Sequence, residues 1–195
     1  VARLLDAGVA ADGTPYFAME YCEGGSLADR LAARGNLSLD DALAVARGLA
    51  SALGAAHARG VVHRDVKPGN VLFDAEERVR LSDFGIAKIL GEDSTRSGAV
   101  LGTISYLAPE QIQGRPVDHR ADLWALGVTL YEMLTGRKPF VGDSYAAVLH
   151  AVLTAEPAPL GAVPAALRDL VARLLEKDPD ARPQSAAEVE SILDA

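Results

Sequence analysis

The sequence predicts an α+β fold in which a few short strands are followed by a mostly helical lobe. The β-rich segments are short and lie before residue 84, whereas the later residues form helical patterns separated by Pro-bearing loops. These helical patterns do not alternate regularly with strands, which argues against a doubly wound parallel sheet.

The first predicted elements are a strand and a short helix joined by glycines. Residues 14–21 are rich in β-forming residues, and CEGG at 22–25 forms a flexible joint after them. The segment 26–35 predicts a short helix that ends at Gly35.

A longer helix is predicted from about Asp40 to Gly60. Ser38 and Asp41 have the spacing of a capping box, and apolar residues recur at intervals of three and four along the segment. Gly60 has the residue type that commonly closes a helix.

The second half of the chain contains a segment, 121–134, that is apolar on nearly all sides. A helix of this kind is buried in the middle of a helical lobe, and Gly136 is expected to end it. Ser185 and Glu188 form another candidate capping box near the last residues.

Composition fits a globular protein and restricts its partners. Of 195 residues, 49% are hydrophobic and 24% are charged. The net charge of −8 argues against nucleic acid as a main partner, because phosphate binding needs concentrated Lys and Arg. The single cysteine, Cys22, fits a reducing compartment, so we expect a cytoplasmic location. No stretch reaches the roughly 18 apolar residues of a membrane span.

Short β segments are also predicted at 61–63, 71–73 and 79–82, with polar residues between them. The last two segments flank DAEER and read as a hairpin. An antiparallel hairpin brings Asn70, before its first strand, beside Asp83, after its second. Amide and carboxylate oxygens suit a Mg²⁺ ion that keeps several waters and bridges phosphates.

Asp65 and Lys67 stand two residues apart, which places both on one side of an extended loop. A carboxylate in this position can accept a substrate proton while the ammonium neutralises phosphate charge. Together with Asn70 and Asp83, these groups predict a phosphoryl-transfer site. Taken singly, each of them also fits a solvated loop without chemistry.

Ordered motifs then identify a family resemblance that covers essentially the whole chain. The motifs are HRDVKPGN at 63–70, DFG at 83–85, APE at 108–110, and the longer strings at 118–140 and 174–189. In these motifs the chain resembles the eukaryotic-like serine/threonine protein kinases found in bacteria.

The resemblance implies a protein-kinase-like fold with a mostly helical C-terminal lobe. Residues 1–21 would be a remnant of the N-terminal lobe, 22–26 the hinge, and 27–195 the C-terminal lobe.

By the same resemblance, the polar cluster would catalyse ATP-dependent phosphoryl transfer to a Ser/Thr hydroxyl of a protein. Asp65 would be the catalytic base, and Lys67 would contact the γ-phosphate and mark serine/threonine specificity. Asn70 and Asp83 would hold Mg²⁺, or Mn²⁺ in its place. Thr103 would hydrogen-bond near Asp65 and Lys67.

The adenine of ATP would lie at the hinge. Met19 would be the gatekeeper, and backbone groups of Glu20 and Cys22 would bind adenine. Leu72 would pack beneath the adenine ring. Ser26 stands where many relatives carry an acidic ribose contact.

Other residues would support the site. Asp122 would anchor the backbone of the catalytic loop, and Glu110 and Arg182 would form a buried ion pair. A hydrophobic column between the lobes would consist of Leu4, His63 and Phe84. The remaining histidines, His57, His119 and His150, have no ligand spacing and are expected to be structural or exposed.

Regulation would act through the segment after DFG. Arg64 would read a phosphate there, and GEDSTRSGAV offers acceptors of which Thr95 and Ser97 are the predicted sites. Our hypothesis is that autophosphorylation, through self-association, orders this segment.

The 195 residues contain neither a GxGxxG loop nor a strand lysine in a VAIK-like setting. Since the sequence opens with Val1, we interpret it as a fragment that lacks these elements and the helix glutamate. In the isolated fragment, Leu4, Met19 and Leu72 would face water, and we expect weak stability, aggregation and no useful turnover. A membrane anchor in the full-length protein would lie outside this chain.

Three other functions stay open on the sequence alone. A pseudokinase would use the same fold as a scaffold, and a lysine upstream of Val1 would argue against it. A small-molecule kinase would share the catalytic aspartate, although Lys67 and the long segment after DFG argue against this class. The third function is metal-assisted hydrolysis by Asp65 and Asp83.

Overall fold

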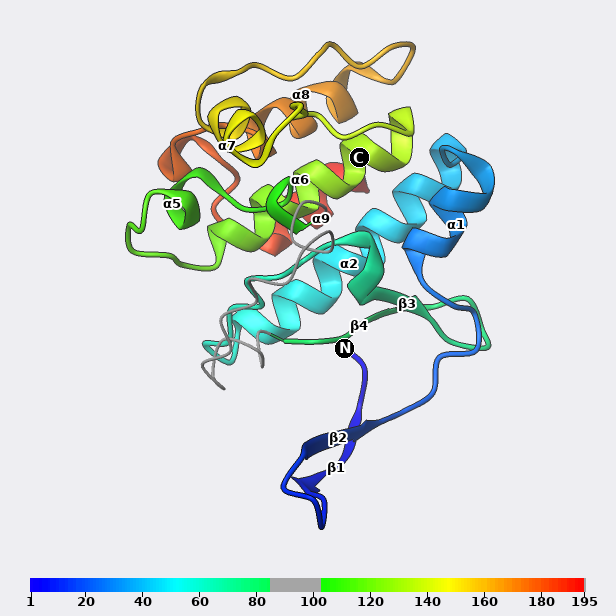
Figure 1. Ribbon diagram of the computed structural model, residues 1–195. Helices are drawn as coiled ribbons and strands as arrows, with labels where there is room; N and C mark the ends of the chain where they lie inside the picture. Colours follow the sequence, from blue (N-terminus) through cyan, green and yellow to red (C-terminus); the bar gives the residue numbers. More distant parts are fainter. Residues whose placement is uncertain (85–102, 195) are drawn as a thin grey trace.

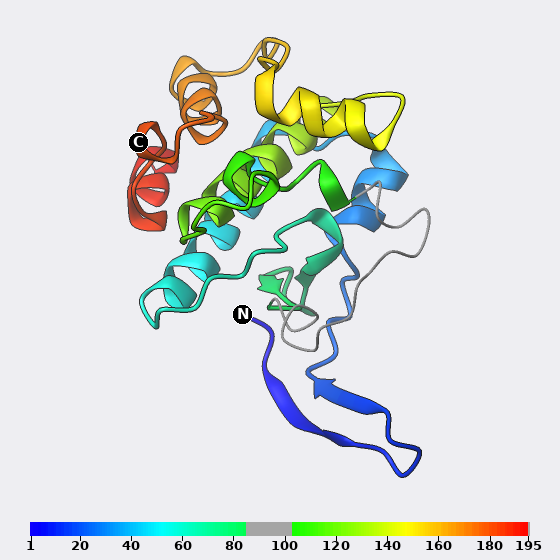
Figure 2. The same cartoon turned by 60° about the vertical axis from the view of Figure 1, so that its left-hand side comes forward.

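The computed structural model of the protein describes residues 1–84 and 103–194. Two long helices, α2 (Leu39–His57) and α6 (Arg120–Thr135), lie side by side at the centre of a helical lobe (Figures 1 and 2). Helix α9 (Ala186–Leu193) packs against α2, and α8 (Ala165–Leu174) packs against α6. The predicted α+β class with a dominant helical lobe is confirmed.

Shorter elements complete this lobe. They are α1 (Leu27–Arg34), the 3₁₀ turn η1 (Pro68–Asn70), α5 (Pro109–Ile112), α7 (Tyr145–Thr154) and the 3₁₀ turn η2 (Pro179–Ala181). None of the helices in the described part of the chain is long and apolar enough to cross a bilayer.

The strands form two separate antiparallel pairs. The first pair is β1 (Leu4–Val9) with β2 (Pro15–Met19), and the second is β3 (Val71–Phe73) with β4 (Val79–Leu81). The β1–β2 hairpin stands away from the helical lobe in both views, whereas β3 and β4 lie against α1 and α2 (Figures 1 and 2).

The core of the lobe is built around α6, most of whose side chains are buried on all sides, as its apolar sequence predicts. Trp124 stacks on Phe140 with ring planes 8° apart. Gly136 ends the helix in the left-handed region at φ 70°, and its N–H donates to the carbonyl of Glu132. A side chain at Gly136 would come within 2.8 Å of the Gly35 carbonyl oxygen, so glycine is required twice over.

Helix α2 begins as predicted and ends earlier than predicted. The Ser38 hydroxyl accepts the N–H of Asp41 at 3.1 Å, which is one half of the expected capping box. The last helical residue is His57, and Gly60 at φ 71° lies in the turn that follows the helix. The N–H of Gly60 donates to the carbonyl of His57, and that of Val61 donates to Ala56.

Two other predictions about local structure need correction. Residues 61–63 form no strand, because the N–H of His63 donates to the Asp122 carboxylate and not to a neighbouring strand. Glu188 does not complete a capping box with Ser185, since its carboxylate accepts the N–H of Gln184 one residue earlier.

The predicted exposure of three apolar residues holds for one of them. Leu4 is 53% exposed on β1. Met19 and Leu72 are half-buried, so their side chains face water only in part. Leu72 lies in β3 between Arg80 on β4 and a bridge to Ser26, so its backbone is paired on both sides.

Candidate active site

The loop that precedes β3 is held in place by a buried carboxylate on α6. Asp122 Oδ2 accepts the N–H of His63 at 2.8 Å, and Oδ1 accepts the N–H of Arg64 at 2.7 Å. Arg64 has a φ of 67°, a conformation that is uncommon for a residue with a side chain. The two charge-assisted bonds therefore stabilise a strained loop backbone, in the place predicted for Asp122.

His57, at the end of α2, is a partner of this carboxylate that sequence reasoning missed. Its Nε2 lies 2.8 Å from Asp122 Oδ2, and both side chains are almost fully buried. The two residues are 65 positions apart. No local pattern signals the pair, because only the packing of α2 on α6 brings them together.

The residues predicted to carry out the reaction lie close together at the end of this loop, next to β3. Lys67 Nζ lies 2.8 Å from Asp65 Oδ2 and 3.4 Å from the Thr103 hydroxyl. Asn70 Nδ2 donates to the carbonyl of Asp65 at 2.7 Å and to Asp65 Oδ2 at 3.0 Å. One carboxylate oxygen of Asp65 is thus held by an ammonium and an amide, while Oδ1 accepts no hydrogen bond from the described residues.

The β3–β4 hairpin brings Asn70 and Asp83 to the same end, as its register requires. Val71 pairs with Leu81, and the N–H of Ser82 donates to the carbonyl of Asn70 at 2.9 Å. Asp83 follows with a φ of 59° and an exposed side chain.

These two side chains fit a divalent cation with few protein ligands. Both amide N–H contacts of Asn70 go to Asp65, so its oxygen is the atom left for a ligand beside the exposed carboxylate of Asp83. Among the described residues there is no group of three or more His, Cys, Asp or Glu side chains that could hold a metal. An amide and a carboxylate oxygen suit Mg²⁺, which keeps several waters, better than they suit Zn²⁺.

His63 is buried behind this cluster and serves as a structural residue. Its Nε2 lies 2.7 Å from the carbonyl oxygen of Ser82, and its ring stands 4.5 Å from that of Phe84. Burial lowers the pKa of His63, which favours the neutral ring. Leu4 is 53% exposed on β1, and its place in the predicted column stays a prediction.

At the expected hinge, Cys22 is buried and burial raises the pKa of its thiol, which fits a small apolar contact and not a reactive group. The Ser26 hydroxyl donates to Asp29 Oδ2 at 2.6 Å and accepts the Asp29 N–H at 3.2 Å. This capping box at the start of α1 was missed, although Ser26 and Asp29 have the right spacing for it. Adenine binding by Met19, Glu20, Cys22 and Leu72, and the ribose contact of Ser26, stay predictions.

The predicted ion pair between Glu110 and Arg182 is present and buried. Two parallel bonds of 2.8 Å join the guanidinium to the carboxylate. Arg182 also donates to the backbone carbonyls of Arg120, Glu176 and Lys177, so its three remaining donors are satisfied. The pair links the segment after residue 103 to the last helices of the lobe.

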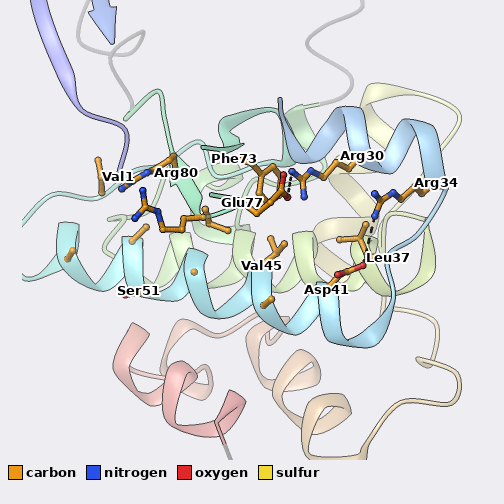
Figure 3. A pocket seen from close by; sticks show the side chains of 16 residues that line it. Val1, Arg30, Arg34, Leu37, Asp41, Val45, Ser51, Phe73, Glu77 and Arg80 are labelled. Carbon is orange, nitrogen blue, oxygen red and sulfur yellow. Dashed lines mark ion pairs between the residues drawn. The ribbon is translucent and has the colours of Figure 1, made fainter. Parts of the chain in front are cut away.

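Grooves border the helical lobe at different places, and two of them matter for the site. One, of about 450 Å³, adjoins Lys67 and Thr103 and is lined by α1 and by Tyr106. The other, of about 700 Å³, lies between α1, α2 and the β3–β4 hairpin (Figure 3). The second contains none of the predicted catalytic residues. The predicted phosphorylation sites Thr95 and Ser97 lie outside the described residues.

Comparison with known proteins supports the resemblance found in the motifs. Residues 2–193 match the model of the protein kinase domain family. The serine/threonine-protein kinase PknB of Mycobacterium leprae is 37% identical over 194 residues, which cover 96% of this chain and 31% of that protein. PknB of Mycobacterium tuberculosis H37Rv is 39% identical over 203 residues, 99% of this chain and 32% of that protein. A probable serine/threonine-protein kinase of Clostridium perfringens, CPE1738, is 41% identical over 195 residues, 97% of this chain and 28% of that protein. The chain thus spans about a third of the length of these relatives.

Proposed function

The chain belongs to the protein kinase domain family, and from that premise we propose that it transfers the γ-phosphoryl group of ATP to serine and threonine hydroxyls of proteins. The observation that carries the proposal is the convergence of Asp65, Lys67 and Asn70 at hydrogen-bond distance, beside the hairpin end that bears Asp83. Relatives named as serine/threonine-protein kinases support the same acceptor class.

Asp65 acts as the base. Its Oδ2 is fixed by Lys67 and Asn70, which aims the carboxylate and leaves Oδ1 for the substrate hydroxyl. As the hydroxyl oxygen attacks the γ-phosphorus, its proton passes to Asp65 and ADP is the leaving group. Lys67, held between Asp65 and Thr103, neutralises charge on the transferred group.

Asn70 and Asp83 are the residues that would hold Mg²⁺, with Mn²⁺ as a substitute. When bound, the ion neutralises phosphate charge during transfer. The position of Asn70 is set by its two bonds to Asp65, so the same amide couples the ion site to the base. Backbone groups of the hinge residues Glu20 and Cys22 would bind adenine, with Leu72 beneath it.

The acceptor protein would enter through the groove of about 450 Å³ beside Lys67 and Thr103. This groove is open to solvent next to the proposed base, which suits a polypeptide better than a small enclosed substrate. We also propose that Arg64 binds a phosphate on Thr95 or Ser97 after self-association and autophosphorylation, and that the domain works in the cytoplasm. Peptide mass spectrometry of active full-length protein tests the phosphorylation. Unmodified Thr95 and Ser97, with full activity of their Ala variants, would exclude it.

The central test uses full-length protein, labelled ATP and a Ser/Thr-containing protein substrate. Asp65→Asn should lower the transfer rate by about 10²–10⁴-fold, since that is the usual contribution of a general base. Asp41→Asn is the matched control, because Asp41 is an exposed carboxylate on α2 that lines the groove without predicted catalytic residues. Phosphate release without transfer would favour hydrolysis, and nucleotide binding without either reaction would favour a scaffold.

A further inference from the structure

One arginine on α1 contacts two parts of the proposed nucleotide site from behind. The guanidinium carbon of Arg30 lies 3.3 Å from the centre of the Phe73 ring, which is only 1% exposed. Its Nη2 lies 2.6 Å from Glu77 Oε2, in the turn of the β3–β4 hairpin, and 3.3 Å from the carbonyl oxygen of Gly24, in the hinge segment 22–26. Figure 3 shows Arg30 beside Phe73 with the ion pair to Glu77.

The place where Arg30 binds is the junction of these two parts. The N–H of Gly24 donates to the carbonyl of Phe73 at 2.9 Å, and the N–H of Phe73 donates to the carbonyl of Gly25 at 3.0 Å. A side chain at Gly24 would approach the Phe73 Cβ to 2.7 Å, so the two backbones are as close as glycine allows. The hinge segment is thus added to the edge of β3 like a short strand.

The junction between the hinge segment and β3 is relevant to nucleotide binding because each of them contains proposed ATP contacts. The hinge segment contains the proposed adenine contact Cys22, and β3 contains Leu72 and directly follows the proposed metal ligand Asn70. A shift of the hinge relative to β3 would therefore change the distance between the adenine end and the phosphate end of the site. A planar guanidinium that stacks on one part and bonds to both is suited to prevent that shift.

Arg34 provides an internal comparison, since it stands one helical turn further along α1 and lines the same groove. Its side chain is 62% exposed, and its ion pair is a distant one, 3.9 Å from Asp41 on α2. The Arg30 side chain is only 22% exposed. Burial, stacking and the bond to the hinge carbonyl therefore separate Arg30 from an ordinary surface arginine.

We propose that Arg30 is a positioning residue for nucleotide binding, which fixes the hinge segment 22–26 against β3 through Phe73, Glu77 and Gly24. The inference rests on the proposed function, because it assumes that these segments hold ATP. Arg30 touches neither Asp65 nor Lys67, so it should affect the affinity for nucleotide and leave the chemical step unchanged.

The experiment compares Arg30→Met with Arg34→Met in the full-length protein. Methionine keeps an apolar stem over Phe73 but has no donor for Glu77 or Gly24. We expect Arg30→Met to raise KM for ATP about fivefold and to keep kcat within about twofold of wild type, while Arg34→Met changes neither. Direct binding of a non-hydrolysable ATP analogue should weaken by the same factor in Arg30→Met.

Two milder variants keep the proposal falsifiable if Arg30→Met fails to fold. Arg30→Lys retains the charge without the planar fork, and Glu77→Gln removes the ion pair alone, so both should give smaller rises in KM of about twofold. Equal KM values for ATP in wild type and all three variants would overturn the proposal. A rise in KM in Arg34→Met as large as that in Arg30→Met, or a large fall in kcat in Arg30→Met, would overturn it as well. A wild type that binds the analogue but transfers no phosphate would refute the proposed function alone. A wild type that binds no nucleotide would refute both.

Discussion

The two β-hairpins of this protein have the same topology and opposite surroundings. β1–β2 pairs longer strands, yet most of its residues are exposed and it stands away from the lobe (Figure 1). β3–β4 pairs three residues with three, yet Val71, Phe73 and Leu81 are fully buried. An isolated two-stranded hairpin is only marginally stable in water. The shorter hairpin is therefore the more stable of the two, because α1, α2 and the hinge segment cover it. The proposed metal ligands flank this shorter hairpin.

The difference in burial between the two hairpins is tested most directly by replacing one phenylalanine in each of them. Phe73→Ala should lower the free energy of unfolding by about 3–5 kcal/mol, because it opens a cavity in the core and removes the ring beneath Arg30. Phe17→Ala in β2 should cost about 0.5 kcal/mol or less, since Phe17 is 43% exposed. Urea unfolding of both variants measures the difference. Equal losses would mean that the β1–β2 hairpin is packed as firmly as β3–β4.

The next largest effect concerns the buried carboxylate that holds the loop leading into β3. Asp122→Ala should lower the free energy of unfolding by about 1–3 kcal/mol, because the N–H groups of His63 and Arg64 would lose their acceptor. The rate of phosphoryl transfer should fall by more than the loss of folded protein explains, since the strained loop positions Asp65. Asp6→Ala in β1 is the control on an exposed carboxylate. A transfer rate unchanged in Asp122→Ala, measured with folded protein, would contradict this role.

The difference between buried and exposed groups also predicts a pH effect. Burial lowers the pKa of Lys177 to about 8, and its ammonium lies 3.9 Å from the Phe140 ring without a hydrogen-bond partner in the described residues. Above that pKa the folded protein releases the proton, whereas the unfolded chain keeps it until its ordinary, higher value. Stability should therefore rise with pH across this window relative to Lys177→Met. Denaturation midpoints at several pH values between 7 and 10 measure the effect. Parallel curves for wild type and variant would exclude it.

The smallest expected effect tests the outer hairpin itself. Val9→Thr places a hydroxyl at an exposed apolar position of β1 and should change the free energy of unfolding by about 0.5 kcal/mol or less. It should still reduce self-association of the 195-residue chain, because it removes part of an exposed apolar surface beside an unpaired strand edge. Light scattering over a concentration series measures this. A marked loss of stability would show that Val9 is packed against other residues.

Sequence reasoning succeeded where the signal is local. The cap at Ser38, the stop at Gly136 and the register of the β3–β4 hairpin each depend on a few adjacent residues. The same register places Asn70 and Asp83 at one end of the hairpin. Residues 61–63 were wrongly expected to form a strand, because their β-forming side chains do not reveal that Asp122 accepts the backbone N–H of His63.

Sequence alone determined the family, the helical class of the lobe and the order of the groups that would carry out transfer, because ordered motifs and short-range periodicity encode them. Only the tertiary structure decided that His57 lies against Asp122 and that Arg30 contacts both the hinge segment and β3. Contacts of this kind depend on how helices and hairpins pack after they form. No single stretch of the chain specifies that packing, since each contact is fixed by the burial of many side chains at once.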